Sequence, residues 1–106
     1  MSFLGSPEMI TLVATSVWYF SQGDEDSFFS WLKSIQCVSG VHGAGRDLFI
    51  EISTTNVSNA DLIELIALFY RYDVDMRQLR QMLTEQNAAW FRDQEKFWHD
   101  KVFGSA

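Results

Sequence analysis

Three arginines around an expected bend between two helical segments are the first candidates for chemistry. The segment carries, in chain order, Tyr70, Arg71, Tyr72, Arg77 and Arg80. Guanidinium groups bind carboxylates and phosphates through paired hydrogen bonds, so the three arginines and Tyr70 are possible contacts for an anion or a ligand. The alternative is internal ion pairing with Asp73, Asp75 and the acidic first half of the chain.

A second candidate surface is acidic. Its five members are Asp24, Glu25, Asp26, Asp47 and Glu51. Carboxylates clustered at 24–26 could hold Mg²⁺ or Ca²⁺, but the spacing of a calcium loop is absent, and Phe28 stands where a ligand is needed. Capping of a helix N-terminus explains the cluster better, and we predict no metal site. As a surface, the five acids suit a basic protein partner.

The remaining reactive side chains each have a structural explanation. Glu95 and His99 are spaced i, i+4 on an expected last helix, which we interpret as an exposed salt pair on its solvated face. His42 could join them only if the fold brings them together. Cys37 is the single cysteine, so an internal disulfide is excluded, and we expect a buried, inert thiol. We therefore predict no enzymatic activity and no cofactor.

The first half of the chain predicts a sheet with one helix. Residues 9–20 are rich in β-branched and aromatic residues and predict the long strand of the sheet, with Leu12, Ala14, Trp18 and Phe20 sharing one face. Apolar residues recur with helical spacing over 24–35, and two short strands at 37–41 and 47–53 flank a glycine-rich hairpin turn. In the last strand, alternation predicts one face in the core and the other mostly wet.

The second half predicts helices. Ser58 begins a helix as its N-cap, and 62–72 is apolar around most of its circumference, so we expect it to be the spine of the core. A short helix around 76–83 and a last helix ending at Phe103 before Gly104 follow. The fold class is therefore α+β, in the order β-α-β-β-α-α-α, with helices packed on one face of a small, mostly antiparallel three-stranded sheet.

Charge and length limit the classes of protein further. The 106 residues have a formal net charge of −6, and residues 1–66 hold eight acids against two bases. An acidic domain repels phosphate backbones, so nucleic-acid binding is disfavoured, and the absence of a long apolar run predicts no membrane segment. With one cysteine and no signal-peptide pattern, we expect a cytoplasmic protein. Residues 9–104 are expected to form one domain, and residues 1–8 a disordered tail or an expression remnant ahead of a natural start at Met9.

Two segments carry a resemblance. LIALFYRYDVDMRQL and NAAWF with FWHDKVFG are similar to the ends of small acidic bacterial proteins of unassigned function, and the order of elements resembles that of immunity proteins that neutralise toxic nucleases. The resemblance implies a protein that binds and inhibits a basic toxin. It transfers no functional residue.

These observations leave three functional hypotheses. The first is a non-enzymatic protein-interaction module, with an immunity-type inhibitor as its sharpest form. The alternative is a small-molecule binding protein with an aromatic pocket between sheet and helices, built from Trp18, Trp31, Trp90 and Trp98 with Arg71 or Arg80 as the anion contact. An enzyme using His42, His99 or a carboxylate has the least support. Because three strands bury few aromatics, we also expect a homodimer.

Overall fold

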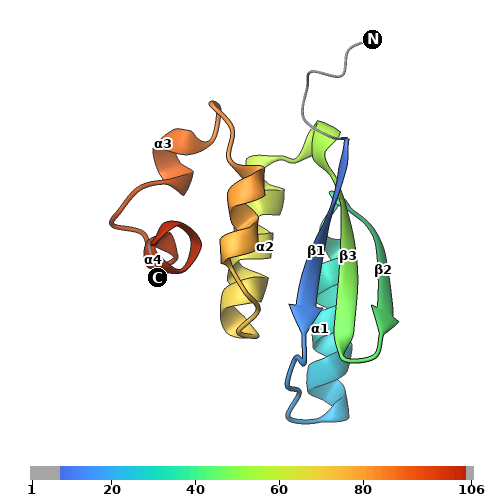
Figure 1. The fold of residues 1–106 in the computed structure, drawn as a ribbon. Coiled ribbons are helices and arrows are strands. Elements are labelled where there is room, and N and C mark those ends of the chain that lie inside the picture. Colours follow the sequence, from blue (N-terminus) through green and yellow to red (C-terminus); the bar gives the residue numbers. More distant parts are fainter. Residues whose placement is uncertain (1–7, 105–106) are drawn as a thin grey trace.

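The computed structural model describes residues 8–104 and has the expected α+β architecture (Figure 1). In chain order the elements are β1 (Met9–Thr15), α1 (Gln22–Ser34), β2 (Val38–Ala44), β3 (Asp47–Ser53), η1 (Thr54–Asn56), α2 (Asn59–Arg71), η2 (Arg77–Met82), α3 (Ala88–Phe91) and α4 (His99–Phe103), where η denotes a 3₁₀ helix. The predicted fold class is confirmed. The prediction for residues 1–8 falls, apart from Glu8, outside the described residues.

The sheet is antiparallel, with strand order β1-β3-β2. Leu12 pairs with Ile50 and Ala14 with Leu48, which places the apolar residues of both strands on one face. Leu12, Ala14, Ile50 and Ile52 are almost completely buried there. The alternation in 47–53 therefore predicted the core face of β3 correctly. β1, however, is an edge strand, and it is no longer than its neighbours.

The strand predicted over 9–20 ends at Thr15. Ser16 has a left-handed backbone (φ 53°), and its N–H donates to the Arg46 carbonyl at 2.8 Å. This turn reverses the inside-outside phase of the residues that follow. Val17 and Tyr19 pack against the core, whereas Trp18 and Phe20, predicted on the buried face, point to solvent. The prediction was wrong there because strand-like composition does not reveal a turn that a serine can adopt.

Helices α1 and α2 cover the apolar face of the sheet. Each begins at a serine N-cap, since Ser21 Oγ accepts the Asp24 N–H and Ser58 Oγ accepts the Asp61 N–H. α1 buries Phe28 and Leu32 against the sheet. α2 is buried on most sides, as its composition predicted, through Leu62, Leu65, Ile66, Leu68 and Phe69. In Figure 1, α1 lies behind the sheet and α2 beside it.

In Figure 1, α2 lies between the sheet and the short helices α3 and α4, and α4 packs on η2. Leu79, Phe91 and Val102 are fully buried in this layer. The single last helix that we predicted is divided, because the chain turns between Phe91 and His99. Asp93 Oδ1 accepts the Glu95 N–H within that turn, a local bond that competes with helix continuation.

Gln78 joins the C-terminal third of the chain to the sheet. The side-chain amide of Gln78, on η2, accepts the Val13 N–H and donates to the Val13 carbonyl, both at 2.8 Å. The amide thus satisfies the backbone of β1 as a neighbouring strand would. The β1 edge of the sheet is closed at this point, which protects it from pairing with another chain.

Candidate functional site

The most distinctive surface feature is a hollow of about 720 Å³ that we call the aromatic groove. It is lined by Trp18, Phe20, Asp24, Trp31, Ala67, Tyr70, Arg71, Tyr72, Asp73 and Phe97. These residues come from the loop after β1, from α1, from the end of α2 and from the turn between α3 and α4. The loop and the C-terminal end of α2 lie at the same end of the molecule (Figure 1).

Large apolar side chains are exposed in this groove. Trp18 is 74% exposed, Phe20 87%, Phe97 59% and Tyr70 44%. Among the described residues, only Met9 and Ile63 are comparable large apolar side chains outside it. Scattered exposed apolar residues are ordinary, but four large aromatic ones around one groove are characteristic of a binding surface.

Asp24 fixes the loop that carries Trp18 and Phe20. Its Oδ2 accepts the Phe20 N–H at 2.9 Å, and its Oδ1 accepts the Tyr72 hydroxyl at 2.8 Å. The Phe20 N–H first, then the Tyr72 hydroxyl, lower the pKa of Asp24. Burial, followed by the hydrogen bond to Asp24, raises the pKa of Tyr72. One carboxylate therefore links the loop, the start of α1 and the end of α2.

The other walls are held by contacts between side chains. Trp31 Nε1 donates to Glu64 Oε1 at 2.7 Å, which links α1 to α2 beside the groove. Tyr70 and Phe97 meet edge to face, with ring centroids 4.8 Å apart, and the Lys101 amine lies 5.6 Å from the centroid of Tyr70. Trp31, Tyr70 and Phe97 are therefore held in place by side-chain contacts before any partner binds.

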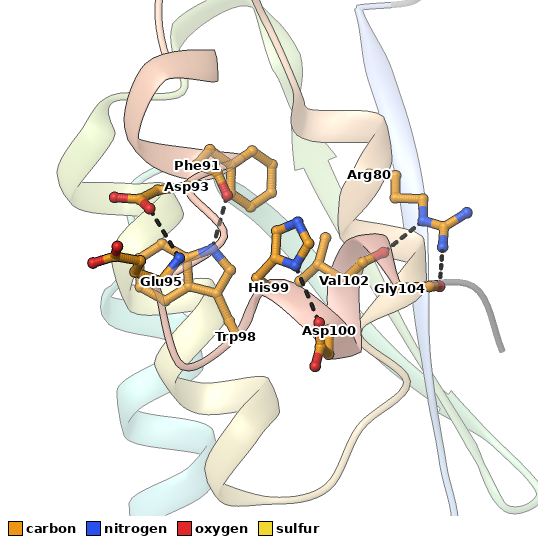
Figure 2. A network of polar contacts seen from close by, with 9 residues as sticks. All are labelled: Arg80, Phe91, Asp93, Glu95, Trp98, His99, Asp100, Val102 and Gly104. Atoms are coloured by element: carbon orange, nitrogen blue, oxygen red, sulfur yellow. Dashed lines mark hydrogen bonds and ion pairs between the residues drawn. The ribbon is translucent and has the colours of Figure 1, made fainter.

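The three arginines do not form one cluster. Arg71 lines the aromatic groove, and Arg77 lines an adjoining smaller hollow that shares Tyr70 and Asp73 with it. Arg80 donates to the carbonyls of Val102 and Gly104 near the C-terminal end of the described chain (Figure 2). Within residues 8–104 no arginine lies within 4.0 Å of a carboxylate, so the expected internal ion pairs are absent. Of the predicted anion contacts, Tyr70 and Arg71 share a site.

The five acids are likewise distributed. Asp24 uses both carboxylate oxygens inside the fold, whereas Glu25 and Asp47 line one shallow hollow at the end of the sheet together with Arg46. Asp26 is exposed and accepts the Gln22 amide. Glu51 faces His42, with Oε2 and Nδ1 3.8 Å apart on the uncovered face of the sheet. They form separate acidic points rather than one patch.

The pocket predicted from four tryptophans is not formed as a unit. Trp18 and Trp31 line the aromatic groove, whereas Trp90 and Trp98 meet each other edge to face in the C-terminal layer, with centroids 6.0 Å apart. Trp98 is buried, and its Nε1 donates to the Phe91 carbonyl at 2.9 Å (Figure 2). The aromatic pocket thus differs from the predicted one in membership and position.

The predicted Glu95–His99 pair is also wrong. His99 Nδ1 lies 3.2 Å from Asp100 Oδ1 (Figure 2). The imidazole also packs against the Phe103 ring, with centroids 5.9 Å apart. Glu95 belongs to the turn before α4, because the helix that would align it with His99 is interrupted. Burial first, then the Asp61 charge, raise the pKa of Cys37 to about 12, which agrees with the predicted inert thiol.

A second hollow, of about 750 Å³, lies between the start of α2 and the segment 81–87. Hydroxyl and amide side chains such as Ser58, Asn59 and Gln86 line it together with aliphatic ones. It contains neither a charged group nor an aromatic ring. The aromatic groove therefore offers the stronger basis for a specific contact.

No match was found among models of protein families, curated proteins or solved structures. The candidate site is therefore defined by the sequence and structure of this chain alone. Across residues 8–104, His, Cys, Asp and Glu side chains do not gather in threes around a point where a metal ion could bind. None of the helices in the same range has the length and apolar character needed to cross a bilayer.

Sequence reasoning missed Phe20 and Phe97 as functional candidates. Both occur in segments with strand or helix periodicity, which predicts burial of aromatic residues. The available signal was local: the polar run Ser21 to Asp26 follows Phe20 directly, and Asp93 to Lys96 precede Phe97. Polar runs of this kind indicate that the adjoining aromatic residue lies at the end of an element, where exposure is easier.

Proposed function

We propose that the protein is a non-enzymatic interaction module that binds another polypeptide through the aromatic groove. The observation that carries the proposal is the exposure of Trp18, Phe20, Tyr70 and Phe97 around one hollow. Aromatic residues supply much of the binding energy at protein interfaces, because they bury a large area at low conformational cost.

The anchoring of the groove supports this proposal. An interface gains affinity when its contact residues are already held in their bound positions. Asp24 holds the loop beside Phe20 through two internal hydrogen bonds, and Tyr70 is held between Phe97 and Lys101. Folding therefore supplies part of the ordering that binding would otherwise require.

The experiment is an affinity capture with the tagged chain in a bacterial lysate that also contains the untagged chain. The Trp18→Ser/Phe20→Ser variant should lose a polypeptide that the wild type retains. Met9→Ser is the control, since Met9 is 46% exposed at the far end of β1. If both variants retain the same polypeptides as the wild type, the proposal is wrong.

An immunity-type inhibitor of a basic toxin is a second form of interaction module, whose contact surface would be the acids outside the groove. The net charge of −6 and the exposed acids outside the groove support a basic partner, which they would attract over a distance. The variant Glu25→Lys/Asp26→Lys/Glu51→Lys should capture such a partner less well, with a larger effect at low salt. Unchanged capture would reject a basic partner for this surface.

A small aromatic anion is the second candidate ligand of the groove. Arg71 lines the groove together with Trp18 and Tyr70, so a guanidinium could meet the anionic group while the rings stack on the ligand. A thermal-shift screen of aromatic carboxylates and phosphates tests this function. Stabilisation that is lost in Arg71→Gln would support it, and no shift with any compound would count against it.

A further inference from the structure

We infer that the polypeptide bound in the aromatic groove is a second copy of this chain, in a symmetric dimer. The inference rests on the proposed function, because it names the partner of the same surface. In a twofold dimer each patch meets its own copy, so a suitable surface must be complementary to itself in charge as well as in shape.

The charges of the groove meet this condition. Its charged lining residues are Asp24, Arg71 and Asp73, and both carboxylate oxygens of Asp24 already accept hydrogen bonds inside the fold. These donors are neutral, so Asp24 keeps its charge, and one arginine against two aspartates gives the lining a formal charge of −1. The charged side chains left free at the same rim are one cation and one anion, Arg71 and Asp73. Across a twofold axis, Arg71 of each copy could face Asp73 of the other, so the groove is nearly balanced in a chain of net charge −6.

The exposed aromatic area is also of the right size. Large aromatic side chains bury about 150–250 Å² each, so the exposed fractions of the four residues correspond to roughly 400–650 Å² per copy. A stable interface needs about 800 Å² per partner. The four aromatic side chains alone would therefore supply half or more of a dimer interface. Ala67 and Arg71, which also line the groove, would add to it.

A low charge separates this occupant from a basic protein. A strongly basic partner would gain little from a groove whose lining carries a formal charge of only −1, whereas it would gain from the acids elsewhere on the molecule. A second copy carries the same excess of acids, so it can approach closely only where the contact surface itself is not strongly acidic. Among the described surfaces, the aromatic groove combines a low charge with a large apolar area.

The test is sedimentation equilibrium or size-exclusion chromatography with light scattering, from nanomolar to submillimolar protein. We expect a dimer for the wild type and for Met9→Ser. Phe20→Ser should weaken association by at least about 30-fold, as expected for truncation of an interface hot spot. Arg71→Glu should weaken it as well, because each copy would then place two acids at the shared rim.

Trp18 gives an independent readout. It is 74% exposed, whereas the other three tryptophans are buried or half-buried, so in the monomer acrylamide should readily quench the part of the emission that Trp18→Phe removes. Dimerisation should protect that part of the emission. The protection should appear as concentration rises and should be absent in Phe20→Ser. Circular dichroism checks that the variants are folded, and a variant that unfolds is replaced by Phe97→Ser, which removes the opposite wall.

A wild type that stays monomeric across this range overturns the inference, as does a dimer whose mass and Trp18 protection are unchanged in Phe20→Ser. The two proposals remain distinguishable. If the wild type is monomeric but captures a different polypeptide in a groove-dependent way, the second copy is rejected and the interaction module stands. If it is monomeric and captures nothing through the groove, both fail.

Discussion

Replacing Gln78 by alanine should destabilise the protein far more than the same change at Gln81. Gln78 makes three side-chain hydrogen bonds of 2.8 Å: two with the Val13 backbone and one to the Asp75 carbonyl. Gln81, on the same 3₁₀ helix, makes one exposed bond of 3.1 Å to the Gln78 carbonyl. The pair therefore compares the same substitution on the same element, with and without contact to the sheet.

The magnitude follows from the contacts that are lost. Each net hydrogen bond contributes about 1 kcal/mol, and solvent can replace the exposed one, so Gln78→Ala should lower the free energy of unfolding by about 2 kcal/mol. For a domain of this size that corresponds to a fall in Tm of roughly 10 °C. Gln81→Ala should cost less than about 0.5 kcal/mol, as is usual for an exposed site.

Urea denaturation followed by circular dichroism measures both variants. Gln78→Glu adds a test of the hydrogen-bond geometry. At neutral pH its carboxylate can accept the Val13 N–H but cannot donate to the Val13 carbonyl, so the variant should be destabilised. Protonation restores a donor, and the deficit relative to the wild type should shrink in acid. Equal effects of Gln78→Ala and Gln81→Ala would refute the reasoning, as would a Gln78→Glu deficit independent of pH.

Three further predictions concern the groove, the thiol and self-association. Tyr72→Phe should lower Tm, whereas Tyr70→Phe should not, because of these two hydroxyls only that of Tyr72 has a hydrogen-bond partner within residues 8–104. Since the pKa of Asp24 is lowered in the fold, the stability lost in Tyr72→Phe should be greatest above about pH 4 and should shrink below it. A loss of stability that stays constant in acid would contradict this. Cys37 is buried, so it should react with Ellman's reagent only as fast as the protein unfolds, and rapid labelling of the native protein would disprove the burial argument. Because the pKa of Cys37 in the fold is raised to about 12, the free energy of unfolding should fall as pH rises above the ordinary thiol value of about 8.5. Self-association should tighten as salt rises from low ionic strength, because screening reduces the repulsion between two copies of charge −6. Capture of a basic partner should instead weaken with salt. Sedimentation across a salt series measures the dissociation constant of the dimer, and a dimer that weakens as salt rises would contradict the prediction.

The parts of the fold that the sequence predicted well depend on local periodicity and caps. Alternation in 47–53 identified the buried face of β3, Ser58 marked the start of α2, and Gly104 marked the end of α4. Each of these signals is contained within a few residues. Packing later in the chain reinforces them and does not reverse them.

The candidate site could not be predicted in the same way. Its walls come from residues as far apart as Trp18 and Phe97, and their exposure depends on two turns that the apolar periodicity does not reveal. Ser16 reverses the phase after β1, and the turn that includes Asp93 divides the expected last helix. Both are cases in which tertiary structure overrides propensity, and both place on the surface an aromatic residue that periodicity assigns to the core.

The position of Gln78 also has a consequence for synthesis on the ribosome. Chains are made from the N-terminus, and β1, β2 and β3 are all complete by Ser53. The side chain that closes the β1 edge comes 25 residues later and therefore leaves the exit tunnel after the three strands. While β3 has emerged and residue 78 has not, the nascent chain would carry all three strands with the β1 edge open, so slow translation at that stage, or a truncation between 54 and 78, should promote aggregation. Translation speed over this interval is therefore a property on which the yield of folded protein should depend.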